Sequence, residues 1–274
     1  MERRKSFLVS DSTLIGKALG ALCLLSLFAN LSLAKQVSVY SYHIDPPFYL
    51  EGQSVDLTRA FVAKLNKWQD QHTFQLMVID RPSLNQKLID DEPYLILWAN
   101  PLWFKSKDPQ VSATTNIFWD ADIWVSHKDN PIKYSEPTDL IGKRIGGRNG
   151  YFYKGVTPLI RSGKTSATLK NNDDLNYTQL IEGNIDAFVM SRSSYLYWKA
   201  TNKDTSKLVV SLSPHDAYKR HLLVSKDNQD LIPLLNDFIV SLKSNTKWNR
   251  NMKVWGVGTL VDPIELDLDE LMDY

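Results

Sequence analysis

Residues 37–48 form a strand-like run that ends in a stiff loop, and this stretch constrains the rest of the chain most. Valine and tyrosine are interspersed with serine over residues 37–42, which predicts a β-strand. The Pro46-Pro47 pair ends that strand, because proline has a fixed φ and no N–H to donate. Phe48 then follows the carboxyl end of the strand, the edge at which ligands bind in open α/β sheets. We expect Tyr42 and Phe48 to line a ligand cleft; the alternative is an ordinary strand end with a Pro-Pro turn.

Helical and strand-like patterns alternate after this first strand. Leucine and aromatic residues recur at helical spacing over residues 56–68, and a second strand is expected at 74–79. A short helix is expected at 82–89 and an apolar strand, of the kind buried on both faces, at 94–98. This alternation is typical of a parallel sheet, so the sequence predicts an α/β fold with mostly parallel sheets flanked by helices.

A second α/β unit is expected in the middle of the chain. The composition changes abruptly at residues 128–131, where we place a first crossover, and we place the return crossover near Arg220. Asp173 or Asp174 is expected to cap a helix over residues 175–181. Further elements are expected as strands at 117–127, 185–190, 208–212 and 218–224 and as helices at 228–242 and around 248–255. The predicted organisation is lobe 1 at 35–127 and 222–261, lobe 2 at 128–221, and an acidic tail at 262–274.

The amino terminus resembles a secretory signal. Basic residues at positions 3–5 precede an apolar run at 18–28, which is too short to span a bilayer comfortably. Residues 32–34 supply small side chains where a signal peptidase cleaves. We therefore expect residues 1–34 to be a cleavable signal that directs the protein to the periplasm; the alternative is an uncleaved anchor.

The composition argues against several classes of function. The single cysteine, Cys23, lies in the predicted signal, so the mature chain has no disulfide and depends on its core for stability. The 32 basic and 31 acidic residues nearly balance, which leaves no basic face for nucleic acid. The five histidines lack metal-ligand spacing, and no Gly-x-Ser-x-Gly elbow is present. We expect a monomer without metal or cofactor that is not an enzyme. The eight Trp and twelve Tyr residues fit a cleft lined by rings.

Five stretches in sequence order resemble the periplasmic solute-binding proteins of the family that serves polar amino-acid ABC transporters. They are Tyr42-His43-Ile44-Asp45-Pro46-Pro47-Phe48, residues 54–61, residues 140–146, residues 182–187 and Lys253-Val254-Trp255-Gly256. The resemblance implies two α/β lobes joined by two crossovers, which close by hinge motion over a ligand held between them. It also implies capture of a small-molecule ligand for an ABC permease in the inner membrane.

Two departures from that family change the expected ligand. Its amino-acid binders use an Arg after the third strand to hold the α-carboxylate, whereas residues 100–105 contain none. They use an Asp for the α-ammonium where this chain has Ser191. A buried ammonium without a carboxylate partner is costly. We therefore expect a small polar or aromatic or anionic solute rather than an ordinary α-amino acid. Residues 150–153 resemble a divergent group of the family.

Candidate site residues come from three further strand ends. Arg148, Asn149, Gly150 and Tyr151 occupy a Gly-rich bend whose N–H groups could converge on an anion; the alternative is a surface arginine beside a turn. Asn100 and Trp103 are expected to form a stacking wall, or else to pack in the core. Ser191 and Arg192 open a helix and could contact ligand, although Arg192 could equally be a surface charge. The candidate ligand-binding residues are Tyr42, Phe48, Asn100, Trp103, Arg148, Asn149, Gly150, Tyr151, Ser191 and Arg192.

Two other functions remain open at this point. The protein could be an orphan or sensor-input binding protein without a transport partner. It could also be a dehydratase-like enzyme on the same fold, with His43 or Asp45 as its acid.

Overall fold

The computed structural model describes residues 35–258, except residues 91, 105, 107 and 202. The predicted signal at 1–34 and the predicted acidic tail at 262–274 lie outside the described residues. No helix in the described part of the chain is long and apolar enough to cross a membrane.

The described residues form a 10-stranded sheet in the order β2-β1-β3-β10-β5-β8-β6-β7, with β4 beside β10 and β9 beside β5. The strands are β1 (Lys35–Ser41), β2 (His72–Val78), β3 (Leu95–Ala99), β4 (Ser112–Ala113), β5 (Phe118–His127), β6 (Arg144–Arg148), β7 (Ser166–Lys170), β8 (Ala187–Ser191), β9 (Leu208–Val210) and β10 (Asp216–Val224). The α-helices are α2 (Leu57–Trp68), α3 (Arg81–Ile89), α4 (Val156–Arg161), α5 (Asp173–Ile181), α6 (Arg192–Ala200), α7 (Ile232–Lys243) and α8 (Thr246–Val254). The 3-10 turns are η1 (Pro101–Trp103), η2 (Pro137–Leu140) and η3 (Lys226–Leu231).

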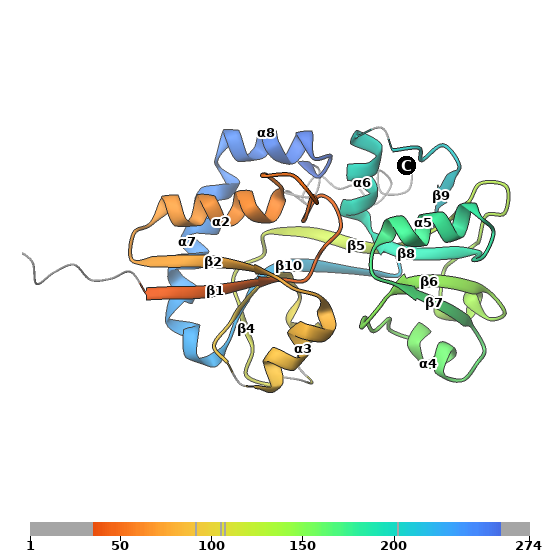
Figure 1. The fold of residues 1–274 in the computed structure, drawn as a ribbon, viewed down its shortest axis with the longest axis horizontal. Helices are drawn as coiled ribbons and strands as arrows, with labels where there is room; N and C mark the ends of the chain where they lie inside the picture. Colours follow the sequence, from red (N-terminus) through yellow and green to blue (C-terminus); the bar gives the residue numbers. More distant parts are fainter. Residues whose placement is uncertain (1–34, 91, 105, 107, 202, 259–274) are drawn as a thin grey trace, which may run out of the picture. The chain divides into compact units, whose positions relative to one another are not determined.

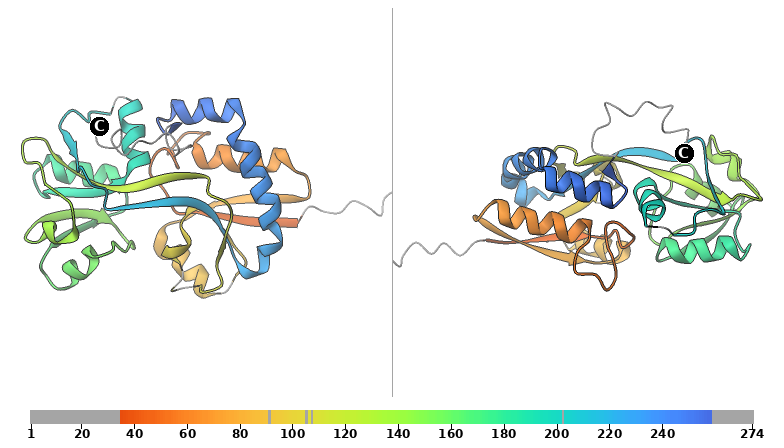
Figure 2. Two further views of the ribbon diagram at one scale, coloured as in Figure 1. Left: turned by 180° about the vertical axis from the view of Figure 1, so that it is seen from behind. Right: turned by 90° about the horizontal axis from the view of Figure 1, so that it is seen from above.

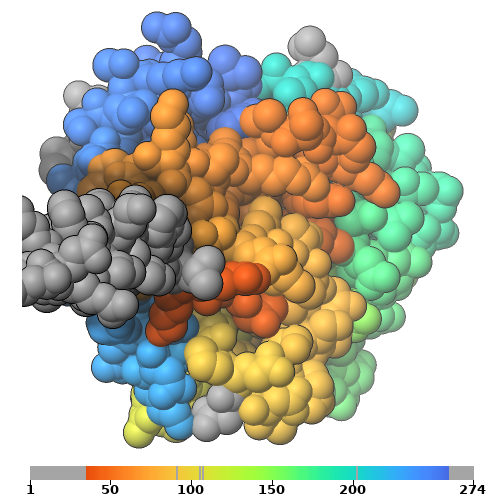
Figure 3. All heavy atoms as spheres, turned by 60° about the vertical axis from the view of Figure 1, so that its left-hand side comes forward, coloured from red at the N-terminus to blue at the C-terminus, as the bar shows by residue number. Residues whose placement is uncertain are grey.

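Two long strands, β5 and β10, join two halves of this sheet (Figures 1 and 2). Residues 216–220 of β10 pair antiparallel with residues 118–122 of β5, and residues 222–224 pair with β3. We call strands β1–β4 with helices α2, α3, α7 and α8 the first half, and strands β6–β9 with helices α4, α5 and α6 the second half. Figure 3 shows that segments from both ends of the described chain, orange and blue, build the first half. The predicted parallel pairing is confirmed for β1 with β3 and for β6 with β7 and β8.

Each half is a layered core with helices on both faces of the sheet. In the first half, Val39 packs with α2, α7 and α8, whereas the next residue, Tyr40, packs on the other face with α3. In the second half, Val125 of the joining strand β5 packs with α5 and α6, whereas its neighbour Trp124 packs with α4. Alternate side chains of a strand point to opposite faces, so apolar runs without polar gaps cover both faces at once.

The starts of α2, α3 and α6 agree with the sequence predictions to within one residue, whereas the predicted cap of α5 does not. Asp56 caps α2 by accepting the Arg59 N–H at 2.7 Å. The cap of α5 is Asn172, whose side chain accepts the Leu175 N–H at 2.9 Å, so the prediction that Asp173 or Asp174 caps this helix is wrong. Both aspartates lie inside its first turn, where negative charge favours the positive end of the helix dipole.

Three further elements differ from prediction. The helix expected at 228–242 is divided into η3 and α7, and Pro233 lies in the first turn of α7, where a missing N–H costs little. Strands β4 and β7 were not predicted, because neither contains an apolar run. The lobe boundaries at residues 127/128 and 221/222 stay a prediction.

Candidate functional site

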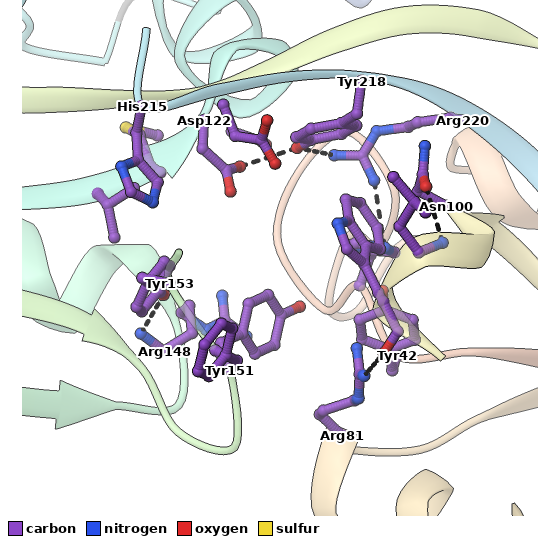
Figure 4. Close-up of a pocket in the computed structure, with 18 of the residues that line it drawn as sticks. Tyr42, Arg81, Asn100, Asp122, Arg148, Tyr151, Tyr153, His215, Tyr218 and Arg220 are labelled. Atoms are coloured by element: carbon purple, nitrogen blue, oxygen red, sulfur yellow. Dashed lines mark hydrogen bonds between the residues drawn. The ribbon is translucent and has the colours of Figure 1, made fainter. Parts of the chain in front are cut away.

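One cavity of about 700 Å³ lies where the carboxyl ends of β1, β3, β6 and β8 approach the long strands β5 and β10. Residues of both halves line it, and its centre is open in the close-up of Figure 4. Loops that follow the carboxyl ends of strands carry ligand sites in α/β sheets, so this is the candidate site.

Seven of the ten predicted site residues line this cavity. They are Tyr42, Phe48, Asn100, Trp103, Arg148, Tyr151 and Ser191. They come from four different strand ends, which the fold brings together around one space. A ligand-binding role for each of them stays a prediction.

The other three predicted residues do not line the cavity. Asn149 and Gly150 are exposed, and the Asn149 N–H is bonded to the Lys170 carbonyl at 3.0 Å as a continuation of the β6–β7 pairing. Gly150 has φ +77°, and a Cβ there would lie 3.1 Å from Pro82. Its role is therefore to let the bend pass close to α3 of the first half. Arg192 opens α6 outside the cavity lining.

Phe48 forms part of the cavity floor rather than an exposed wall. Only 1% of it is exposed, and its ring packs against those of Trp98 and Phe118. The Arg220 guanidinium lies 4.5 Å from its ring centroid. Trp98 has φ +66°, a strained value for a residue with a side chain, next to a register shift in the opposing β10. The Trp98 carbonyl accepts a hydrogen bond from Arg220 at 2.8 Å.

Arg220, on β10, is a buried residue of the cavity wall whose hydrogen-bond donors are all used. Its Nε and Nη2 atoms lie 2.7 and 2.6 Å from Asp120, on the neighbouring β5. Its remaining contacts are with the Trp98 carbonyl, with His43 Nε2 at 3.2 Å and with the Tyr218 hydroxyl at 3.2 Å. Burial, and then the nearby Arg220 charge, hold the pKa of His43 well below its usual value, so the imidazole is neutral. Arg220 therefore organises the wall and has no donor left for a ligand.

Arg148 is likewise occupied by the protein itself. Its guanidinium forms an ion pair with Asp45, in the loop after β1, and lies 3.6 Å from Asp173 at the start of α5. Asp45 also accepts the Asp173 N–H at 2.8 Å. These contacts connect the first half to the second, and an anionic ligand at Arg148 would compete with two carboxylates. Because His43 and Asp45 are both engaged in these networks, the dehydratase hypothesis gains no support.

Sequence reasoning missed several charged residues that line the cavity, among them Asp122, Arg81 and the Arg220 described above. Asp122 lies on β5 directly opposite Ser191 of β8, and the Tyr218 hydroxyl donates to its Oδ1 at 2.8 Å. Arg81 begins α3, donates to the Trp103 carbonyl at 3.1 Å and lies 4.2 Å from the Phe104 ring centroid. The signal for Asp122 was present: Asp120 and Asp122 are two residues apart in a strand that is otherwise apolar up to residue 125, which places both on one face.

Aromatic rings close much of the remaining wall. Trp103 meets Tyr218 edge to face at 4.6 Å, and Tyr42 meets Tyr151 at 5.9 Å between the two halves. The Tyr153 hydroxyl accepts the Arg148 N–H at 2.8 Å, which fixes the bend after β6. Within the described part of the chain, no cluster of three or more His, Cys, Asp or Glu residues could hold a metal ion.

No family model matches the sequence, and no curated protein matches it. Solved structures match the fold. A mutant of ArgBP from T. maritima aligns with a TM-score of 0.64 at 18% identity, over 80% of this chain and 94% of that one. The GluR0 ligand-binding core from Nostoc punctiforme in complex with L-glutamate aligns with a TM-score of 0.65 at 15% identity, over 81% and 99%. The substrate binding protein of an amino acid ABC transporter aligns with a TM-score of 0.61 at 17% identity, over 80% and 98%. The chain therefore has the two-lobe α/β fold of periplasmic binding proteins, with two crossovers.

Proposed function

We propose that this chain is a solute-binding protein that holds one small molecule in the cavity between its two halves. The observation that carries the proposal is the cavity itself: about 700 Å³, lined by rings and a few polar groups from several strand ends of both halves. That combination of size, shape and lining is typical of small-molecule sites. Two structures of similar fold are consistent with it: the GluR0 ligand-binding core in complex with L-glutamate, and the substrate binding protein of an amino acid ABC transporter.

The proposed ligand is a small polar or aromatic solute that stacks on the rings of the wall. Residues 100–105, which follow β3, contain no arginine for an α-carboxylate, and Ser191 ends β8 where the resemblance implies an Asp for the α-ammonium. The two charges of an α-amino acid therefore lack the partners that the resemblance implies. Of the predicted ligand classes, an anion has the least support, because Arg148 already contacts Asp45 and Asp173.

The setting of this function is proposed from the sequence. A signal at residues 1–34 would direct the chain to the periplasm, and the two lobes, 35–127 with 222–261 and 128–221, would close on the ligand as a monomer. The liganded protein would then deliver its solute to an ABC permease. A sensor-input or orphan protein would bind in the same way, and an adjacent permease gene would favour transport.

Thermal unfolding in the presence of a broad ligand panel tests the binding function. A ligand that binds only the folded chain raises the Tm by mass action. At 100 times its Kd, the stabilisation is about 2.7 kcal/mol, which is readily measured. We expect at least one amino acid, amine, organic acid or small peptide to raise the Tm. No shift across such a panel, with a cooperative unfolding transition in the free protein, would count against a solute-binding function.

A further inference from the structure

Asp122 is a carboxylate in the cavity wall without a basic partner. No ion pair joins it to a Lys, Arg or His among the described residues, and its one side-chain hydrogen bond there comes from Tyr218. The other buried acids near the cavity differ. Asp120 is paired with Arg220, and Asp45 and Asp173 share Arg148.

The three arginines of the cavity are engaged elsewhere; of its two lysines, Lys219 lies over the Trp119 ring, and Lys154 is exposed after the end of β6. Arg220 and Arg148 contact the carboxylates just named. Arg81 lies on the first-half side, held by the Trp103 carbonyl and by the rings of Phe104 and Tyr42. Asp216, directly opposite Asp122 in the β5–β10 pairing, adds a second negative charge to this part of the wall. The Arg220 charge favours the ionised form of Asp122, whereas the charges of Asp120 and Asp216 oppose it, so these three neighbours together leave one excess negative charge beside Asp122.

A chain of hydrogen bonds orients Asp122 toward the cavity. Arg220 Nη2 donates to the Tyr218 hydroxyl at 3.2 Å, so the hydroxyl hydrogen is free to point at Asp122 Oδ1, 2.8 Å away. The second oxygen, Oδ2, has no hydrogen bond from a described residue. Figure 4 shows Asp122 beside His215 and Tyr218, with Tyr151 and Tyr153 across the open centre. Faces of tyrosine rings attract cations.

We propose that the cavity of this solute-binding protein receives the positively charged nitrogen of a small organic cation, an amine or quaternary ammonium, at Asp122. The proposal rests on the solute-binding function and specifies its ligand class. An N–H of an amine would donate to Oδ2, whereas a quaternary ammonium would contact the carboxylate and the tyrosine rings without a hydrogen bond. In either case the ligand supplies the charge partner that the folded chain leaves out.

Protonation of Asp122 makes the affinity for a cation depend on pH in a direction that can be measured. Burial raises the pKa of Asp122 to about 7 in the free protein. A bound cation stabilises the ionised carboxylate, so it must displace the proton at lower pH. Affinity for a cation therefore rises between pH 5 and pH 8, by up to ~100-fold for a group that titrates near 7. A ligand held as an anion would show the opposite trend, since it would favour protonated Asp122.

Other ionisable groups face this region from each neighbouring element. They are Asp120 on β5; His215, Asp216, Tyr218, Lys219, Arg220 and His221 on or next to β10; Arg148, Tyr151, Tyr153 and Lys154 at or after the end of β6; Tyr42, His43 and Asp45 after β1; Arg81 on α3; Asp173 on α5; and Arg192 on α6. Burial lowers the pKa of His43 and His215 and raises that of the tyrosines. Asp122→Asn separates the titration of Asp122 from these groups, because it should remove the pH dependence.

The test is a calorimetric titration of the full chain with three sets of probes. The cations are ethanolamine, putrescine, choline and tetramethylammonium, the anions are acetate, succinate and benzoate, and the neutral probes are glycerol and benzyl alcohol. We expect at least one cation to bind more tightly at pH 8 than at pH 5. Asp122→Asn should weaken that binding by ~100-fold or more, because a buried charge would lose its partner. Asp129→Asn removes the same charge from an exposed turn after β5 and should leave affinity unchanged.

Each alternative outcome is distinct. Binding of anionic or neutral probes alone, or cation binding that Asp122→Asn leaves intact, would overturn the cation proposal while the solute-binding function stands. Tight binding of amines without quaternary compounds would support the hydrogen bond to Oδ2, and the reverse would support ring contacts. Failure of every probe, here and in the broad thermal panel, would overturn the binding function itself.

Discussion

Arg220 forms hydrogen bonds to residues of strands that are far apart in sequence. Its guanidinium is 1% exposed and lies between the carboxylate of Asp120, the carbonyl of Trp98 and the hydroxyl of Tyr218. A buried arginine is tolerated only when its charge and its N–H groups are satisfied. Because these partners come from β3, β5 and β10, this one residue fixes the point where the two halves of the sheet join.

Asp120→Asn should therefore destabilise the protein strongly. The change leaves the buried Arg220 charge without its carboxylate, a loss of about 3–5 kcal/mol in the free energy of unfolding. Urea unfolding at neutral pH measures it. The matched control is Glu92→Gln, which breaks an exposed pair with Lys87 and should cost at most about 1 kcal/mol. Equal losses in the two variants would contradict the structural role of Arg220.

At the scale of elements, the loop after β1 contacts the second half directly. Asp45 in this loop pairs with Arg148 at the end of β6 and accepts the N–H of Asp173 at the start of α5. Gly150 passes close to Pro82 at the same border. These contacts close one side of the cavity in the present conformation, so their strength should govern how readily the halves separate.

Asp45→Asn should loosen this border without unfolding the chain. Arg148 keeps Asp173 as a partner, so we expect a loss of only about 1–2 kcal/mol in the free energy of unfolding. Hydrogen exchange should become faster in the loops at residues 43–48 and 149–154, while exchange in β3 and β8 stays slow. Asp80→Asn is the control, because asparagine still caps α3 and the border is untouched. Uniformly faster exchange throughout the sheet would argue instead for global destabilisation.

The element pattern was largely predictable from sequence, and the site was predictable only in part. Periodic apolar runs predicted β1, α2, β3, β5, β8 and β10, because core strands and helices bury whole faces. Seven of the ten predicted residues line the cavity, because they lie at or just after strand ends, and their ligand-binding role stays a prediction. Asp122 and Arg220 were missed because they lie within strands, and their approach to the cavity depends on pairing between β5 and β10. Asp120 and Arg220 are 100 residues apart, and such pairing is not visible in local patterns.

At the scale of the whole molecule, the two-lobe fold predicts that the halves move relative to each other. The sequence has one cysteine, Cys23, in the predicted signal, so cysteines introduced into the mature chain can be labelled without background. Spin labels at Ile89→Cys on α3 and Arg161→Cys on α4 would report the separation of the two halves. Both positions are exposed and outside the cavity lining.

We expect a bound ligand to narrow this distance distribution and to shift it to shorter values. A ligand that contacts both halves stabilises the closed arrangement over open ones, so it changes the populations of the two. Double electron–electron resonance with and without a ligand from the thermal panel measures the shift. Identical distributions would mean that the halves form one rigid body and that binding occurs without hinge closure.

Titration of a protein whose cavity is blocked shows whether this cavity is the solute site. Ala217 lines the cavity from β10 with an exposed side chain, so Ala217→Trp should fill the space without disturbing the core. Val240→Trp adds the same indole to an exposed position of α7 and serves as the control. Calorimetric titration with a ligand from the panel should give one site per chain in the wild type and in Val240→Trp, and a loss of at least ~100-fold in affinity in folded Ala217→Trp. Unchanged affinity in Ala217→Trp would mean that the solute binds outside this cavity.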